Sequence, residues 1–211
     1  IALDRVIHMR LAAGDTGWRC LGPLQAMLSE GTASSAAPLW TGESAGGTSG
    51  ERPSVRVDRH GNGLLEIVLA RGGQLNALDA SMWGVIITVA TAARDEASVR
   101  AVMLRSDDAK AFSAGGDVRA LAQTNSWRER VAFLHLEYAA LAALSRLARA
   151  KPVVALSDGV TMGAGLGLFL TANRRVVTER ASLAMPECKI GLVPDVGVLH
   201  HLTALPPGFV G

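Results

Sequence analysis

Residues 158–167 read Asp-Gly-Val-Thr-Met-Gly-Ala-Gly-Leu-Gly, and this stretch decides the fold. It follows residues 152–156, a short apolar run with strand character, and it leads into residues 163–172, which we predict to be helical. Glycine lets the backbone turn sharply and approach a ligand closely. A strand, a glycine loop and a helix in this order predict an α/β domain with its functional groups at the loop.

A second glycine loop, residues 111–117, reads Ala-Phe-Ser-Ala-Gly-Gly-Asp and follows another strand-like run, residues 101–105. Backbone N–H groups at a helix start have no intrahelical partner and lie at the positive end of the dipole. Two such groups that converge on one point would stabilise an oxyanion. Neither loop is followed by a Walker lysine, which makes phosphate binding the weaker interpretation. Each loop taken alone is also compatible with an ordinary strand-to-helix turn.

Regular elements are predicted outward from both loops. Residues 77–97 and 127–149 have helical periodicity, and Asp79 or Ser81 is a suitable N-cap for the first. Further strands are predicted at residues 64–69, 175–178 and 182–184, and a helix at residues 194–202 with Pro194 in its first turn.

The first 52 residues differ from the rest of the chain. Residues 32–53 are rich in Ser, Gly, Ala and Thr, a composition that buries too little apolar surface to offset its ordering entropy. We therefore expect residues 1–52 to form a flexible or irregular N-terminal segment, loosely packed over residues 32–52. Residues 53–211 are expected to form one core.

Composition narrows the function classes. The 211 residues are 49% hydrophobic and carry a formal net charge of only +2, which argues against a general nucleic-acid binder. The apolar run over residues 153–170 is interrupted by Asp158 and glycines, so no membrane span is expected. Cys20 and Cys188 follow no metal-ligand spacing. Residues 1–20 mix arginines with acids and give no clear targeting signal in either direction.

Several motifs together resemble the crotonase (enoyl-CoA hydratase/isomerase) superfamily. The resemblance covers roughly residues 55–211, and its motifs follow the family's order and spacing: Asn76-Ala77-Leu78, residues 114–119, residues 158–165, Ala184-Met185-Pro186-Glu187 and residues 191–197. It implies the ClpP/crotonase spiral of β-β-α units, with further helices beyond Gly211, so we expect the chain to be truncated at its C-terminus. It also implies an acyl-CoA substrate and no separate cofactor or metal, because CoA is part of the substrate; an oligomer is possible.

Three positions indicate which subgroup of the superfamily the chain resembles. Gly167 stands where enoyl-CoA hydratases carry the first of two catalytic glutamates, Glu187 matches the second, and Asp195 replaces a glycine. This pattern, with Glu137-Tyr138, resembles the 3-hydroxyisobutyryl-CoA hydrolases, which act in valine degradation. It implies a thioesterase of the mitochondrial matrix if the source is eukaryotic and of the cytoplasm otherwise. A hydratase or isomerase of the same fold, or a catalytically silent assembly protein, are the alternatives.

The resemblance also implies roles for individual residues. The N–H groups of Gly116 and Ala164, in loops shaped by Gly115 and Gly163, would hold the thioester oxygen in an oxyanion hole. Glu187 would act as nucleophile or as general base toward water, and the sequence leaves both open.

Other candidate residues carry both a functional and a structural interpretation. By the resemblance, Asp195 would orient the substrate or handle protons beside Glu187. Glu137 is equally compatible with a charge at the core edge and with a group supporting the site. Asp117 is expected to cap a helix rather than to catalyse, and Cys188 is expected to be inert because no basic partner is evident.

Overall fold

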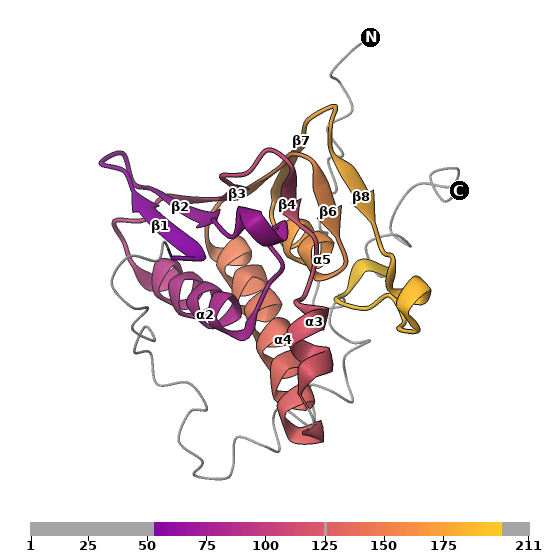
Figure 1. Ribbon diagram of the computed structural model, residues 1–211. Helices are drawn as coiled ribbons and strands as arrows, with labels where there is room; N and C mark the ends of the chain where they lie inside the picture. Colours follow the sequence, from indigo (N-terminus) through magenta and orange to yellow (C-terminus); the bar gives the residue numbers. More distant parts are fainter. Residues whose placement is uncertain (1–52, 125, 200–211) are drawn as a thin grey trace.

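The computed structural model describes residues 53–124 and 126–199 (Figure 1). The segment expected to be loosely packed, residues 32–52, lies outside the described residues. The strands are β1 (Val55–Arg59), β2 (Leu64–Leu69), β3 (Ala101–Ser106), β4 (Ala111–Ser113), β5 (Val153–Ser157), β6 (Val160–Met162), β7 (Arg174–Val177) and β8 (Ser182–Ala184). The α-helices are α2 (Ala80–Asp95), α3 (Val118–Gln123), α4 (Trp127–Ala150) and α5 (Ala164–Leu170), with short 3-10 helices η2 (Gly72–Gln74) and η3 (Glu187–Ile190).

Two sheets share the strands in a regular alternation. The larger sheet has the order β1-β2-β3-β5-β7, and the smaller one has the order β4-β6-β8. Every pairing is parallel except that of β1 with β2. After β3, β5 and β7 the chain adds the next strand to the smaller sheet. This alternation confirms the predicted spiral of β-β-α units.

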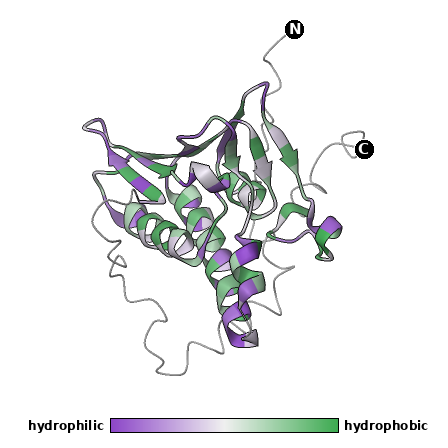
Figure 2. Ribbon diagram, in the orientation of Figure 1, coloured by the Kyte–Doolittle hydropathy of each residue, from purple (hydrophilic) through white to green (hydrophobic). Residues whose placement is uncertain are grey.

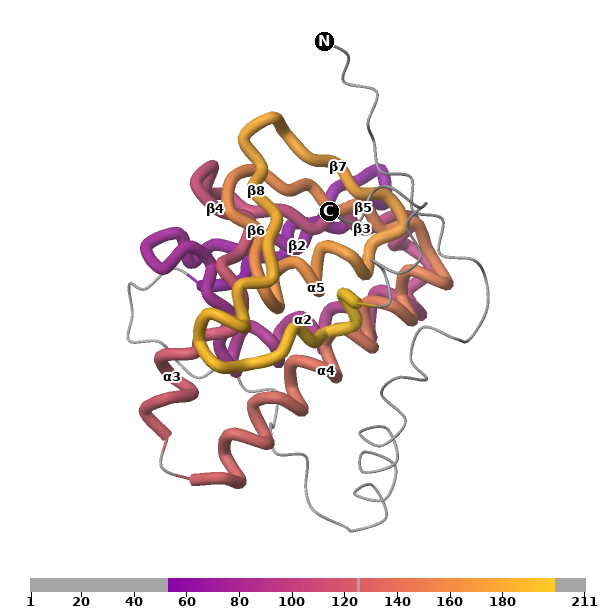
Figure 3. The backbone as a smooth tube through the Cα atoms, turned by 90° about the vertical axis from the view of Figure 1, so that its right-hand side faces the viewer, coloured from indigo at the N-terminus to yellow at the C-terminus, as the bar shows by residue number. Residues whose placement is uncertain are grey.

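The hydrophobic core lies between the larger sheet and helices α2 and α4, which pack against each other (Figures 1 and 3). Its largest fully buried side chains include Trp83, Ile86, Leu104, Leu144 and Leu147. In α4 the buried residues begin at Glu137, so the second half of the helix is buried. The first turns of α4 project beyond the sheets and carry many of its hydrophilic residues (Figure 2). By length and composition α4 could cross a membrane, but 44% of its apolar window is buried inside this fold.

Most predicted elements are present with small shifts of their ends. Asp79 caps α2, because its side chain accepts a hydrogen bond of 2.9 Å from the Met82 N–H. The predicted helix over residues 194–202 is wrong at its start. Val196 and Gly197 have φ angles of 47° and 78°, in the left-handed region that a right-handed helix excludes. Within the described residues, helical backbone begins only at Val198.

Candidate active site

The two glycine loops meet side by side. A Cβ added to Gly115 would lie 3.0 Å from the Met162 carbonyl oxygen and 3.4 Å from the Ala164 backbone nitrogen. Gly115 and Gly163 also have φ angles of 103° and 51°, which side chains rarely allow. Glycine is therefore needed at both positions, for conformation and for the close approach of the loops.

The N–H groups of Gly116 and Ala164 have no backbone acceptor in the part of the chain that the structure describes. Leu78 bonds to both neighbours of Gly116: its N–H donates to the Gly115 carbonyl, and its carbonyl accepts from the Asp117 N–H. In a parallel bridge of this kind the N–H of Gly116 itself points away from Leu78. The Ala164 N–H belongs to the first turn of α5, where no intrahelical partner exists. That both groups point into one cavity stays a prediction.

Glu187, in η3, lies directly against this junction. Its Oε1 atom would be 2.7 Å from a Cβ on Gly163, so its carboxylate occupies the space left by the missing side chain. Its Oε2 atom is buried and has no hydrogen-bond partner among the described residues. Burial raises the pKa of Glu187, a bond from its own N–H lowers it, and the nearby Asp195 charge raises it further. A buried carboxylate oxygen without a partner is available to a substrate or a water molecule.

Glu137, in α4, adds a carboxyl group that the sequence analysis left unassigned. Its side chain is buried, and its Oε2 atom would be 3.5 Å from a Cβ on Gly116. Burial, followed by the charges of Asp195 and Glu187, raises the pKa of Glu137 to about 8. Glu137 is therefore mostly protonated at neutral pH and presents an O–H donor beside the glycine loop of residues 111–117. The position of Glu137 on the apolar face of a long helix was the sequence signal for a buried carboxyl. That position alone does not predict which residues the carboxyl contacts.

Asp195 completes a group of three carboxyls from separate segments. It is half-buried, and its Oδ2 atom accepts a hydrogen bond of 2.7 Å from the Tyr138 hydroxyl. Its charge contributes to the raised pKa of both Glu137 and Glu187, so the three groups act on one another. Figure 3 shows how the segment after β8 crosses α5 and α4 to bring them together. Neighbouring carboxyls with separated pKa values suit a division into a base and an acid.

Asp117 has the structural role expected of it. Its side chain accepts from the Ala120 N–H at the start of α3 and pairs with Arg71 at 2.8 Å. Burial alone would raise the pKa of Asp117, but the Ala120 N–H and the Arg71 guanidinium lower it overall. Cys188 is exposed, with a free thiol. Within residues 53–124 and 126–199, no three His, Cys, Asp or Glu side chains are arranged to hold a metal ion.

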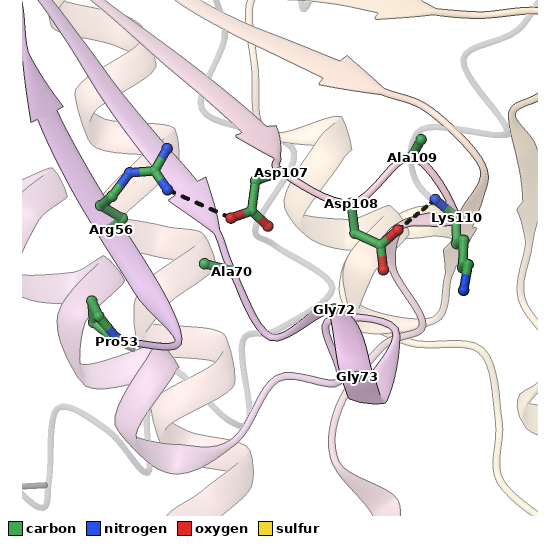
Figure 4. Close-up of a pocket in the computed structure, with 9 residues that line it drawn as sticks. All are labelled: Pro53, Arg56, Ala70, Gly72, Gly73, Asp107, Asp108, Ala109 and Lys110. Atoms are coloured by element: carbon green, nitrogen blue, oxygen red, sulfur yellow. Dashed lines mark hydrogen bonds and ion pairs between the residues drawn. The ribbon is translucent and has the colours of Figure 1, made fainter. Parts of the chain in front are cut away.

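A separate pocket of about 690 Å³ lies where β2 and β3 end (Figure 4). It is lined by Pro53, Arg56, Ala70, Gly72, Gly73, Asp107, Asp108, Ala109 and Lys110. Arg56 and Asp107 form an ion pair across it at 3.5 Å. Its two cationic and two acidic side chains balance one another, and it contains none of the three carboxyl residues. The predicted chemistry therefore lies elsewhere.

Comparison with known proteins agrees with this geometry. A family model described as enoyl-CoA hydratase/isomerase matches residues 64–211. The chain is 38% identical over 157 residues to the mitochondrial 3-hydroxyisobutyryl-CoA hydrolase of Mus musculus, covering 74% of this chain and 40% of that protein. It is 39% identical over 153 residues to the small ribosomal subunit protein mS47 of Neurospora crassa, covering 70% of this chain and 30% of that protein. The chain thus spans less than half the length of these curated relatives.

Solved structures share the same fold. An enoyl-CoA hydratase from Bacillus anthracis superposes with a TM-score of 0.67 at 28% identity, covering 72% of this chain and 58% of that one. One from Rhodobacter sphaeroides gives a TM-score of 0.67 at 33% identity, with 73% and 46% covered.

Proposed function

The chain belongs to the enoyl-CoA hydratase/isomerase family, and from that premise we propose that it hydrolyses an acyl-CoA thioester, with 3-hydroxyisobutyryl-CoA as substrate. The products are 3-hydroxyisobutyrate and CoA. One observation carries the proposal: the Glu187 carboxylate lies against Gly163, near Asp195 and Glu137, and one of its oxygens is buried with no hydrogen-bond partner among the described residues. Such an oxygen is suited to attack on an acyl carbon or to deprotonation of water.

The mechanism assigns a separate task to each group. The N–H groups of Gly116 and Ala164 stabilise the negative charge on the thioester oxygen as the tetrahedral intermediate forms. Glu187 either attacks the acyl carbon or takes a proton from the attacking water. The C–S bond then breaks, and the CoA sulfur leaves as a thiolate that takes up the proton given by the water molecule. If Glu187 was the nucleophile, that water cleaves the acyl–Glu187 anhydride and restores the carboxylate. With water as the second reactant, one thioester gives one carboxylic acid and one thiol.

The two other carboxyl groups, of Glu137 and Asp195, would recognise and orient the acyl group of the substrate. Protonated Glu137, next to Gly116, can donate a hydrogen bond to an oxygen of the acyl group, which favours an acyl chain carrying a hydroxyl. Asp195 accepts protons or hydroxyl hydrogen bonds on the other side of Glu187. A short hydroxyacyl group therefore suits this site better than a plain alkyl chain.

A second candidate is a structural role in a larger assembly. The 39% identity to a ribosomal subunit protein favours it, since that relative is named for its place in a particle. The relatives named as mitochondrial hydrolases support a mitochondrial matrix location for either function. An oligomer is also proposed, on family membership alone.

Free-thiol release from a panel of acyl-CoAs tests the proposal, using the full natural chain. The panel contains 3-hydroxyisobutyryl-CoA, its analogue without the hydroxyl, isobutyryl-CoA, and the unsaturated methacrylyl-CoA. Thiol release that is fastest with the hydroxylated substrate supports the hydrolase. Hydration of methacrylyl-CoA without thiol release would identify a hydratase. If no substrate in the panel reacts and the chain co-sediments with ribosomal subunits, the assembly role is favoured.

A further inference from the structure

The Tyr138 hydroxyl holds the segment that carries Asp195. It donates a hydrogen bond of 2.7 Å to Asp195 Oδ2. Tyr138 is buried in the second half of α4, next to Glu137, so its ring is fixed by the core. One hydroxyl group thus ties the segment to the most firmly packed part of the long helix.

The segment before Asp195 is largely exposed, whereas Val196 after it is buried. The large side chains before Asp195 face solvent: Ile190, Leu192 and Val193 are 60%, 50% and 73% exposed. Val196 has a φ of 47°, which is an outlier for a β-branched residue. Such a conformation persists only where the surroundings impose it, and the bond of the Tyr138 hydroxyl to the preceding residue, Asp195, is one such restraint.

Charge repulsion also makes the Tyr138 hydrogen bond necessary to hold the Asp195 side chain in place. Its carboxylate lies near that of Glu187, and like charges repel one another at short range. Without a hydrogen-bond donor, the Asp195 side chain would lower its electrostatic energy by turning toward solvent, where water screens its charge. Among the described residues, Tyr138 supplies the side-chain hydrogen bond that opposes this movement.

We propose that Tyr138 is a positioning residue, which holds Asp195 toward Glu187 and acts on the reaction only through Asp195. The inference rests on the proposed function for its kinetic readout. In this proposal Tyr138 does not contact the substrate, because its hydroxyl donates to Asp195. Its removal should slow turnover while leaving the binding of CoA intact.

A double-mutant cycle on the full natural chain tests this, with Tyr138→Phe, Asp195→Asn and the two combined. We expect Tyr138→Phe to lower kcat about 10- to 100-fold with KM nearly unchanged, as for loss of one hydrogen bond to a charged group. In the Asp195→Asn background it should cause no further loss. Thr88→Val, which removes a hydroxyl bonded to the Gly84 carbonyl at 3.0 Å in α2, is the matched control and should keep wild-type turnover. Wild-type kcat in Tyr138→Phe, or losses that simply add, would overturn the proposal.

A spectroscopic measurement keeps this test independent of the hydrolase assignment. Tyr138 is the single tyrosine of the 211 residues, and the Tyr138→Phe spectrum identifies its signal in a longer chain. Burial and the Asp195 carboxylate raise the pKa of its phenol well above the ordinary value. Asp195→Asn should therefore let the phenol ionise at lower pH in an ultraviolet titration. That shift supports the contact even if no thioester is hydrolysed, whereas an unchanged titration contradicts it.

Discussion

Val196 occupies the space that a side chain at position 167 would need. A Cβ placed on Gly167 would lie 2.6 Å from Val196 Cγ2 and 2.8 Å from Val196 Cβ, closer than real carbon contacts allow. Gly167 is the position at which hydratases of this family carry a catalytic glutamate, by the resemblance of the sequence motifs. The packing of Val196 therefore leaves no room for a side chain at position 167 in α5.

Gly167→Ala should destabilise the protein by about 1–3 kcal/mol, the usual cost of overpacking a core. An ordinary helical glycine would instead gain about 0.5–1 kcal/mol from the same change, so the sign of the effect is diagnostic. Val196→Ala in the Gly167→Ala background should recover part of the loss, and denaturant unfolding measures both. Gly73→Ala is the control, because no atom lies within 4 Å of the added Cβ. A stabilised Gly167→Ala protein would show that Val196 does not fill this space.

Glu137 should make the folded state less stable as the pH rises. Its pKa is about 8 in the folded protein and 4.5 as the ordinary value, so only the folded state holds the proton between these limits. The stabilisation is complete below pH 4.5 and is lost as the pH rises to 8, at up to about 1.4 kcal/mol per pH unit. Glu137→Gln cannot undergo this loss. Its free energy of unfolding, measured by denaturant titration, should therefore rise relative to that of the wild type from pH 5 to 8. The exposed Glu179→Gln should follow the wild type, and a constant gap between Glu137→Gln and wild type would refute the burial argument.

Long apolar periodicities predicted the frame of the fold correctly. β2 and β8 have the predicted bounds, and α4 differs from the prediction by a single residue at its end. The strands β4 and β6 were missed, because three residues within a glycine loop carry no periodicity. They form only because parallel neighbours from other turns of the spiral pair with them.

The candidate site was less predictable than the fold, because its geometry depends on contacts between distant segments. Motif order predicted Glu187 and Asp195 as site residues, but not the hydrogen bond from Tyr138 to Asp195, which spans 57 residues of sequence. Pro194 suggested a helix start, whereas the left-handed backbone of Val196, two residues later, excludes a helix there. Glu137 stayed ambiguous, since the sequence does not reveal that its carboxyl meets a glycine loop.

Ala164→Pro should remove one oxyanion donor without breaking α5. Ala164 is the first residue of the helix, where proline is well tolerated because that N–H lacks an intrahelical partner. Loss of one such donor commonly lowers kcat by 10²–10³, so we expect a loss of about that size in thiol release. Ala164→Gly keeps the N–H and should keep most of the activity. If Ala164→Pro folds normally and turns over at the wild-type rate, the Ala164 N–H is not part of an oxyanion hole.

Glu187→Gln should abolish most thioester hydrolysis, because an amide neither attacks an acyl carbon nor accepts a proton well. Asp195→Asn should slow turnover less, and should change its pH dependence by removing one of several interacting carboxyls. CoA binding, measured by calorimetry, should persist in both variants, since neither carboxylate offers the nucleotide a favourable contact. The exposed Glu179→Gln controls for the simple loss of a negative charge.

The pH profiles then separate the carboxyls. Because burial raises the pKa of Glu187, activity that needs its carboxylate should fall on acidification at a pH above the ordinary value of 4.5. Ionisation of Glu137 near pH 8 should remove its O–H donor and give an alkaline limb, which Glu137→Gln should lose because its amide N–H donates at every pH. Near-normal hydrolysis by Glu187→Gln would exclude the mechanism. An alkaline limb that survives in Glu137→Gln would assign that limb to another group and leave the role of Glu187 intact.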